Sequence, residues 1–290
     1  MATPREIRRR IRSVRNTAQI TRAMEMVAAA RMRRAQERVR SARPYATQIR
    51  AMIAALSDLG AAVDVSQFPL LQHRPVKKAQ LILVTADRGL AGALNSNVIR
   101  RALRFIHEDA GVPVEMVAIG RKGRDFFARV GQNMTAEFTH LGPAPTMDQI
   151  RPAITLAIND FIEGRVDAVY VVYTRFINTL QQQPEVLQIL PIEAPSDLAE
   201  SERVRDFIFE PSPEAVLQAL LPRYVEIQLY QALLESIASE ESARMVAMRN
   251  ATDNARELID DLTLTLNKAR QAQITREVSE IAAGAAALGG

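Results

Sequence analysis

A loop that begins with Thr85 carries residue types able to bind a phosphate group. Residues 85–95 (TADRGLAGALN) begin at the last residue of an apolar run, LILVT (81–85), that predicts a buried strand. A glycine-bearing loop between a strand and a helix can hold phosphate on its backbone N–H groups. The spacing matches neither of the common phosphate-binding glycine motifs, and no Lys or Ser/Thr is placed for a phosphate and its magnesium ion. We therefore favour a structural turn, capped by Asp87, in which Gly89 and Gly92 provide unusual backbone angles or close packing.

A second strand–glycine–helix junction at 119–127 (IGRKGRDFF) brings Arg121, Lys122 and Arg124 together. These cations could bind an anion, but we favour a solvated helix start.

Two acidic pairs could suggest carboxylate catalysis. The pairs are Glu240 with Glu241 and Asp260 with Asp261. Neighbouring positions on a helix point to different faces, so neither pair can converge on one substrate. We expect both pairs to be solvated surface groups.

Composition excludes several classes of protein. The 290 residues are 48% hydrophobic and 24% charged, which excludes general disorder. The chain has no cysteine and three scattered histidines, so we expect no metal site built on these residues. We also expect no cofactor. No apolar run approaches the roughly 20 residues that cross a bilayer, so we expect no direct membrane insertion.

The basic charge is concentrated at the N-terminus. Residues 1–50 contain 14 Arg and three acidic residues, whereas the other 240 residues contain 23 basic and 30 acidic groups. Such an arm suits a polyanion or an acidic protein partner. Its arginines encircle the predicted helix, and no aromatic residue lies within 1–44 for base stacking, so we expect no nucleic acid.

Both ends of the chain carry the seam of an antiparallel coiled coil. Apolar residues occupy nine of the eleven positions 7, 11, 14, 18, 21, 25, 28, 32, 35, 39 and 42. They occupy eight of the ten positions 238, 241, 245, 248, 252, 255, 259, 262, 266 and 269. If the two helices pair starting from the ends that adjoin the central domain, residue 7 lies beside about residue 263. Residues beyond about 265 then have no intrachain partner.

That unpaired end is nevertheless apolar, which predicts a covering protein. Its tip residues are Ile274, Val278, Ile281 and Leu288, and the segment 281–288 has no charge. Residues 23–30 (AMEMVAAA) are also apolar around most of the helix.

The middle of the chain predicts an α/β fold. Strands are expected at 81–85, 114–119, 168–173 and, as an edge strand carrying Pro191, 186–192. Helices between them imply a Rossmann-like domain with a mostly parallel sheet. We assign 1–57 and 214–290 to the coiled-coil helices, 75–194 to the α/β domain, and 195–213 to a loop or hairpin that we name the foot.

Long motifs resemble the gamma subunits of bacterial-type F-type ATP synthases. They are EIRRRIRSVRNTAQITRAMEMVAAARMRRAQ at 6–36, the segment 243–288, and DFIFEPSPEAVLQALLPRYVE at 206–226, with both glycine loops. The resemblance covers essentially the whole chain. It implies a non-catalytic rotor shaft inside a ring of three alpha and three beta subunits. The α/β domain and foot would stand on the membrane c-ring beside the epsilon subunit, on the cytoplasmic face of the cell membrane.

The resemblance also implies residue roles. Met24 would meet an acidic segment of beta, and Arg270 with Gln271 would hydrogen-bond a beta loop. Further contacts to alpha and beta would come from Arg8, Arg9, Arg12, Arg31 and Arg34. The foot would face the c-ring through Arg205, Phe207 and Phe209. A basic nucleic-acid-binding coiled coil and a nucleotide-using α/β enzyme stay as alternatives.

Overall fold

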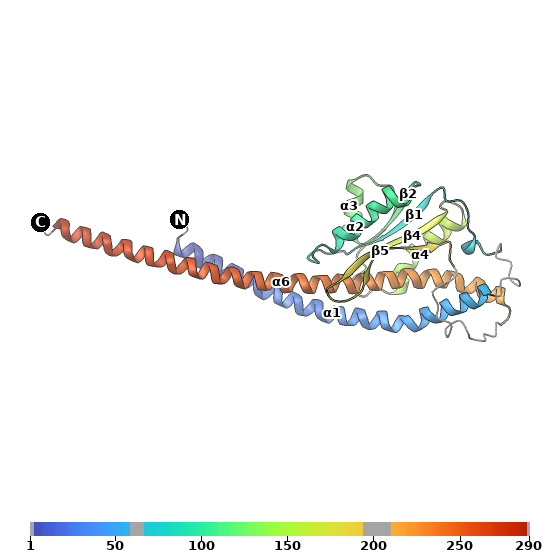
Figure 1. The fold of residues 1–290 in the computed structure, drawn as a ribbon, viewed down its shortest axis with the longest axis horizontal. Helices are drawn as coiled ribbons and strands as arrows, with labels where there is room; N and C mark the ends of the chain where they lie inside the picture. Colours follow the sequence, from blue (N-terminus) through green and yellow to red (C-terminus); the bar gives the residue numbers. More distant parts are fainter. Residues whose placement is uncertain (1–2, 59–66, 194–209, 289–290) are drawn as a thin grey trace. The chain divides into compact units, whose positions relative to one another are not determined.

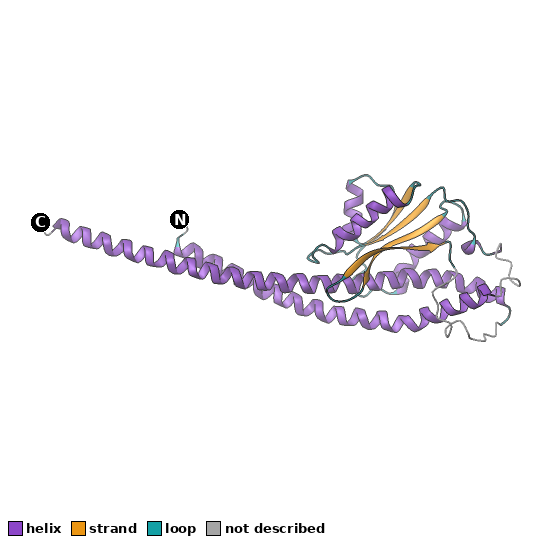
Figure 2. Cartoon of the chain, viewed as in Figure 1, coloured by secondary structure: helices purple, strands orange, loops and turns teal. Residues whose placement is uncertain are grey.

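A computed structural model describes residues 3–58, 67–193 and 210–288. The chain forms two compact units, residues 1–28 with 245–290 and residues 29–244, and the helices α1 and α6 contribute to both (Figures 1 and 2). The helical elements are α1 (Pro4–Asp58), the 3₁₀ turn η2 (Pro69–Leu71), α2 (Leu94–Arg104), the π-helical turn η3 (Phe105–Asp109), α3 (Arg121–Arg129), α4 (Met147–Ile162) and α6 (Pro213–Leu288). The strands are β1 (Ala79–Val84), β2 (Val114–Ile119), β3 (Met134–Phe138), β4 (Ala168–Phe176) and β5 (Gln182–Leu190).

Five strands of the 29–244 unit form one sheet in the order β3-β2-β1-β4-β5. The first four are parallel, and β5 runs antiparallel to β4 at one edge. The predicted α/β fold with a mostly parallel sheet is therefore confirmed. Strand β3 was not predicted, because its five residues alternate between half-buried and exposed positions at the opposite edge of the sheet.

The edge strand β5 differs from its prediction. It begins four residues earlier, at Gln182, because pairing with β4 recruits the polar segment 182–185. Pro191 follows the strand instead of lying in it. The proline within the strand is Pro184, which an edge strand tolerates because its missing N–H breaks no interior ladder.

The sheet has a hydrophobic layer on each face. On one face β1 and β2 pack through Leu81, Leu83 and Met116 against α2 and α3. On the other face Ile82, Val117 and their neighbours pack against α4, together with the parts of α1 and α6 that belong to this unit. Strand residues alternate between the faces, so successive side chains fill opposite layers. The result is a three-layer domain with the sheet in the middle (Figure 2).

The predicted coiled-coil seam is confirmed by burial. Every predicted seam position on α1 and α6 whose burial is described is buried or half-buried. In the 1–28 with 245–290 unit the two helices lie side by side. The Thr21 and Thr252 hydroxyls are 2.7 Å apart, and Arg249 Nε lies 2.9 Å from Glu25 Oε1. Partner numbers fall along α6 as they rise along α1, so the pair is antiparallel.

The observed register lies close to the predicted one. Pairing residue 7 with about 263 puts residue 21 beside about 249, three residues from its observed partner, Thr252. That offset is less than one helical turn. Every side chain from residue 270 to 284 is exposed, as expected for helix beyond the end of its partner.

Candidate functional sites at the carboxyl edge of the sheet and on the coiled coil

The loop after β1 forms a turn held by its own side chains. The Ala86 N–H donates to Asn95 Oδ1 at 3.0 Å, which ties the loop to the first turn of α2. Positive φ angles occur at Leu90 (63°) and Gly92 (56°). At Gly89 the angle is not in the left-handed region, and an added Cβ would make only an ordinary 3.9 Å contact with Lys122. The prediction that position 89 requires a glycine is therefore wrong. The residue with the left-handed conformation is Leu90.

The loop after β2 packs tightly against the first loop. Gly120 has φ 92°, and a Cβ there would collide with the carbonyl oxygen of Thr85. An added Cβ at Gly123 would come within 3.0 Å of the Thr85 side chain. Both glycines are needed for the close approach of the two loops, a role that the motif at 119–127 did not reveal.

The first N–H groups of α3 are already used within the chain. The Arg121 N–H donates to Asp87 Oδ1 at 3.0 Å, the Lys122 N–H to the Ala86 carbonyl at 3.1 Å, and the Gly123 N–H to Thr85 Oγ1 at 2.9 Å. Asp87 thus caps the neighbouring helix α3. A phosphate at this helix end would have to displace the Asp87 carboxylate.

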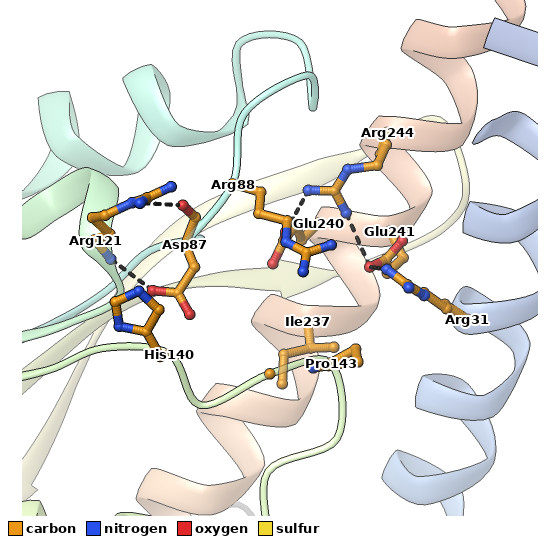
Figure 3. Close-up of a pocket in the computed structure, with 11 residues that line it drawn as sticks. Arg31, Asp87, Arg88, Arg121, His140, Pro143, Ile237, Glu240, Glu241 and Arg244 are labelled. Atoms are coloured by element: carbon orange, nitrogen blue, oxygen red, sulfur yellow. Dashed lines mark hydrogen bonds and ion pairs between the residues drawn. The ribbon is translucent and has the colours of Figure 1, made fainter. Parts of the chain in front are cut away.

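A pocket of about 350 Å³ lies against these loops and against α1 and α6 (Figure 3). Its charged members come from four separate segments, and all belong to the 29–244 unit. The lining residues are Arg31, Asp87, Arg88, Arg121, His140, Gly142, Pro143, Ile237, Glu240, Glu241 and Arg244.

The inner wall of the pocket is a buried charge cluster. Arg244 lies 2.5 Å from Glu240 and 2.9 Å from Glu241, and Arg31 lies 3.7 Å from Glu241. Arg244 also donates to the carbonyl of Gly89 at 3.3 Å. Burial raises the pKa of Glu240, while the charge of Arg244 acts in the opposite direction. The cluster therefore joins α6 to both α1 and the loop after β1.

The prediction that Glu240 and Glu241 are solvated is wrong. Glu241 is only 4% exposed, and Glu240 is half-buried. The two carboxylates share Arg244, which stands four residues after one and three after the other. This spacing, together with the place of residue 241 in the seam, was the feature of the sequence that could have predicted the burial and pairing of these carboxylates. Asp260 and Asp261 are exposed, as predicted.

The chemistry available at the pocket is mainly electrostatic. Its buried carboxylates are paired with arginines. Within 3–58, 67–193 and 210–288, no group of three or more His, Asp or Glu side chains could hold a metal ion. The same ranges contain no helix long and apolar enough to cross a membrane. The arrangement suits a charged joint between elements better than acid–base or phosphoryl chemistry.

The predicted contact residues of the coiled coil differ in how exposed their side chains are. Met24 is half-buried, whereas Arg8, Arg9, Arg12, Arg270 and Gln271 are exposed. In the 29–244 unit Arg34 is exposed, but Arg31 already faces Glu241 in the buried cluster.

The apolar residues beyond the paired helix are open to solvent. Ile274, Val278 and Ile281 are 49%, 59% and 73% exposed. Met26 and Val27, in the apolar segment of α1, are 62% and 50% exposed. The Leu288 side chain and the foot residues Arg205, Phe207 and Phe209 lie outside the part of the chain that the structure describes.

Comparison with solved structures shows a shared fold. A chain of the Euglena gracilis mitochondrial ATP synthase OSCP/F1/c-ring aligns over 98% of this chain and 94% of its own, with a TM-score of 0.69 and 18% identity. A chain of the Tetrahymena thermophila mitochondrial ATP synthase central stalk/c-ring covers 80% of this chain and 99% of its own, with a TM-score of 0.57 and 23% identity.

Comparison of sequences shows the family. A family model described as ATP synthase matches residues 3–288. The ATP synthase gamma chain of Roseiflexus castenholzii is 58% identical, and that of Chloroflexus aurantiacus is 55% identical, each over 99% of both chains. The chain belongs to the family of ATP synthase gamma chains.

Proposed function

We propose that this chain is the rotating central-stalk subunit of an F-type ATP synthase. Ion flow through a membrane ring of c subunits turns it, and it drives the catalytic sites of a ring of three alpha and three beta subunits in sequence. Support comes from the family and from similar solved structures, which are described as parts of a rotor and of a central stalk. We further propose that it is itself non-catalytic, contacts the epsilon subunit, and is held at the cytoplasmic face of the membrane by its partners.

The exposed apolar end of α6 is the observation that carries this proposal. Ile274, Val278 and Ile281 project from a helix that has lost its intrachain partner. Such side chains are a liability in water unless another protein covers them. A cavity at the centre of a subunit ring would cover them on all sides, and so would suit a helix exposed around its whole circumference.

Charged side chains near that end would provide contacts that can form and break. Arg270 is exposed, and its forked guanidinium can pair with carboxylates of a beta subunit without deep burial. Gln271 would add neutral hydrogen bonds beside it. Met24 would meet an acidic segment of beta, and the exposed arginines Arg8, Arg9 and Arg12 would add weaker contacts.

The nucleotide-enzyme alternative is disfavoured by the loops after β1 and β2. Their backbone donors at the start of α3 are bonded to Asp87, Ala86 and Thr85. A polyphosphate would meet the Asp87 carboxylate at the place where it needs N–H groups.

Co-expression with alpha and beta subunits tests the proposal. We expect native mass spectrometry to give one copy of this chain per three alpha and three beta subunits. ATP hydrolysis should appear in the complex and not in the isolated chain. A probe on this chain should rotate when ATP is added. A monomer that fails to associate with either subunit would contradict the proposal.

A further inference from the structure

Strand β4 extends beyond its neighbour in the sheet. Its ladder with β1 ends at the pair Leu83–Val172, and β1 itself ends at Val84. Strand β4 continues to Phe176. Thr174 therefore lies past the end of β1, yet it is only 2% exposed. A buried strand edge with unpaired backbone groups is costly, so another element has to take the place of β1 there.

The backbone of Thr174 points away from β5. Its partner across the antiparallel ladder is Pro184, which has no N–H to donate. In an antiparallel pair a residue directs its N–H and C=O to the same side. Both polar groups of Thr174 therefore face the side from which β1 is missing.

Serine hydroxyls of α6 replace the missing strand. The Thr174 N–H donates to Ser236 Oγ at 3.1 Å, and Ser239 Oγ donates to the Thr174 carbonyl at 3.1 Å. One turn further along, Ser242 Oγ donates to the carbonyl of Thr179, in the turn between β4 and β5, at 2.9 Å. The three serines stand three residues apart, so they share one face of the helix.

These serines are unfavourable for the helix considered alone. Alanine is the better helix former, and a hydroxyl buried without a partner is costly. Ser239 and Ser242 are fully buried and Ser236 is 8% exposed. Their bonds to Thr174 in β4 and to Thr179 in the turn after it offset these costs.

The bonds provide a constraint that the surrounding packing lacks. Ala232, Leu233 and Ile237 of α6 lie in the same apolar core, and apolar contact is not directional. A hydrogen bond depends on distance and angle, so it resists rotation of the helix about its own axis. We propose that Ser236, Ser239 and Ser242 form a torsional joint through which torque passes between α6 and the α/β sheet. This assignment rests on the rotor function proposed above.

The test measures torsional stiffness in the complex with alpha and beta subunits. The chain has no cysteine, so Asn97→Cys on the exposed side of α2 provides a unique attachment point for a probe on the α/β domain. With the catalytic ring arrested, the variance of the probe angle reports the stiffness between the ring and the domain. We expect Ser236→Ala, Ser239→Ala and Ser242→Ala together to raise this variance about twofold, because directional ties are lost while apolar packing stays.

Hydrogen exchange and a matched variant complete the test. The Thr174 amide should exchange about fivefold faster in the triple variant, as expected when one hydrogen bond is lost. Ser96→Ala, an exposed serine on α2, should change neither readout. A variance equal to that of Ser96→Ala would overturn the joint, and so would unchanged exchange at Thr174. Absence of rotation in the unmodified complex would instead overturn the rotor function, and the joint with it.

Discussion

Residues 213–244 and 245–284 belong to one helix, α6, but their apolar side chains have different surroundings. In the first segment Leu217, Leu221 and Leu233 are buried against the sheet and α4, with exposed fractions of 4% or less. In the second segment Leu264 and Ile281 are 61% and 73% exposed. The 29–244 unit builds a hydrophobic core between its sheet and helices, whereas the coiled-coil unit buries apolar side chains only along its seam. A continuous helix can therefore carry buried core side chains in one unit and exposed apolar side chains in the other.

Aromatic residues occur in only one of the two units, so their spectroscopic signal reports on the folding of that unit. All five tyrosines and all nine phenylalanines lie within 29–244, and the chain has no tryptophan. Near-ultraviolet signals therefore report on that unit alone, while the far-ultraviolet helix signal reports on both. The stability of the 29–244 unit can therefore be measured separately from that of the coiled coil.

The largest effect is expected from a cavity in the α/β core. Phe161 is 1% exposed, and the guanidinium of Arg74 lies 4.6 Å from the centre of its ring. We expect Phe161→Ala to lower the free energy of unfolding of the 29–244 unit by about 3–5 kcal/mol. Denaturation followed in the near-ultraviolet measures the loss. The neighbouring Ile162 is 48% exposed, so Ile162→Ala should stay within about 0.5 kcal/mol. Equal losses for the two variants would show that this unit is not held by its own core.

A smaller effect is expected where the two glycine loops meet. A side chain at Gly120 collides with the backbone of Thr85, so Gly120→Ala should cost more than about 2 kcal/mol, measured by the same signal. Gly131 also has a positive φ (72°), but no atom lies within 4 Å of an added Cβ. Gly131→Ala should cost only about 1 kcal/mol, for backbone strain alone. A Gly120→Ala variant as stable as Gly131→Ala would contradict the close approach of the loops.

Acid should weaken the α/β unit through Asp167. The backbone N–H groups of Lys77 and Lys78, at 2.9 and 3.2 Å, together with the charge of Arg74, lower the pKa of Asp167. Its folded pKa lies below its unfolded pKa, so its stabilisation is present above the unfolded value and is lost as the pH falls through the folded value.

Asp167→Asn should therefore destabilise the 29–244 unit at pH 7, by about 1 kcal/mol after allowance for solvent screening. The difference from the unmodified chain should disappear in strong acid. The pH dependence of near-ultraviolet unfolding measures it. Asp148 carries a 79% exposed side chain, so Asp148→Asn is the matched control and should show little change at any pH. A pH-independent loss in Asp167→Asn would mean that the ionised carboxylate is not responsible.

The smallest effect on the chain itself is expected at the exposed end of α6. Ile281→Ser should change the stability of the isolated chain by less than about 0.5 kcal/mol. In the complex with alpha and beta subunits it should speed dissociation about tenfold, because buried apolar area is lost. Val130→Ser, at a 56% exposed site in the other unit, should affect neither measurement. If Ile281→Ser destabilises the isolated chain, this end is packed within the chain and the contrast between the units fails.

The coiled-coil seam could be predicted from the sequence pattern. Its periodicity predicts which side chains of α1 and α6 are buried, because a helix of known pitch has only one face at that spacing. The polar exceptions Thr21 and Thr252 meet as a hydrogen-bonded pair, and Glu25 meets Arg249. Helix lengths predicted the register to within one turn.

The candidate sites were less predictable. Solvation of Glu240 and Glu241 was a reasonable expectation from local sequence and was wrong, since Arg31 and the loop after β1 enclose them from distant parts of the chain. The role of Asp87 as a cap of α3 also depends on a loop 34 residues away. The roles of Met24, Arg270 and Gln271 depend on other subunits and stay predictions.

The amino-acid sequence by itself determined the α/β class, the buried seam, the unpaired apolar end and the resemblance to a family. These features follow from local periodicity, composition and long motifs. Only the tertiary structure decided which charges are buried together at the pocket, which glycines the loops require, and that serines of α6 complete the edge of β4. Such contacts join residues far apart in the chain, and their strength depends on distance, angle and exclusion of water, none of which is encoded at a single position.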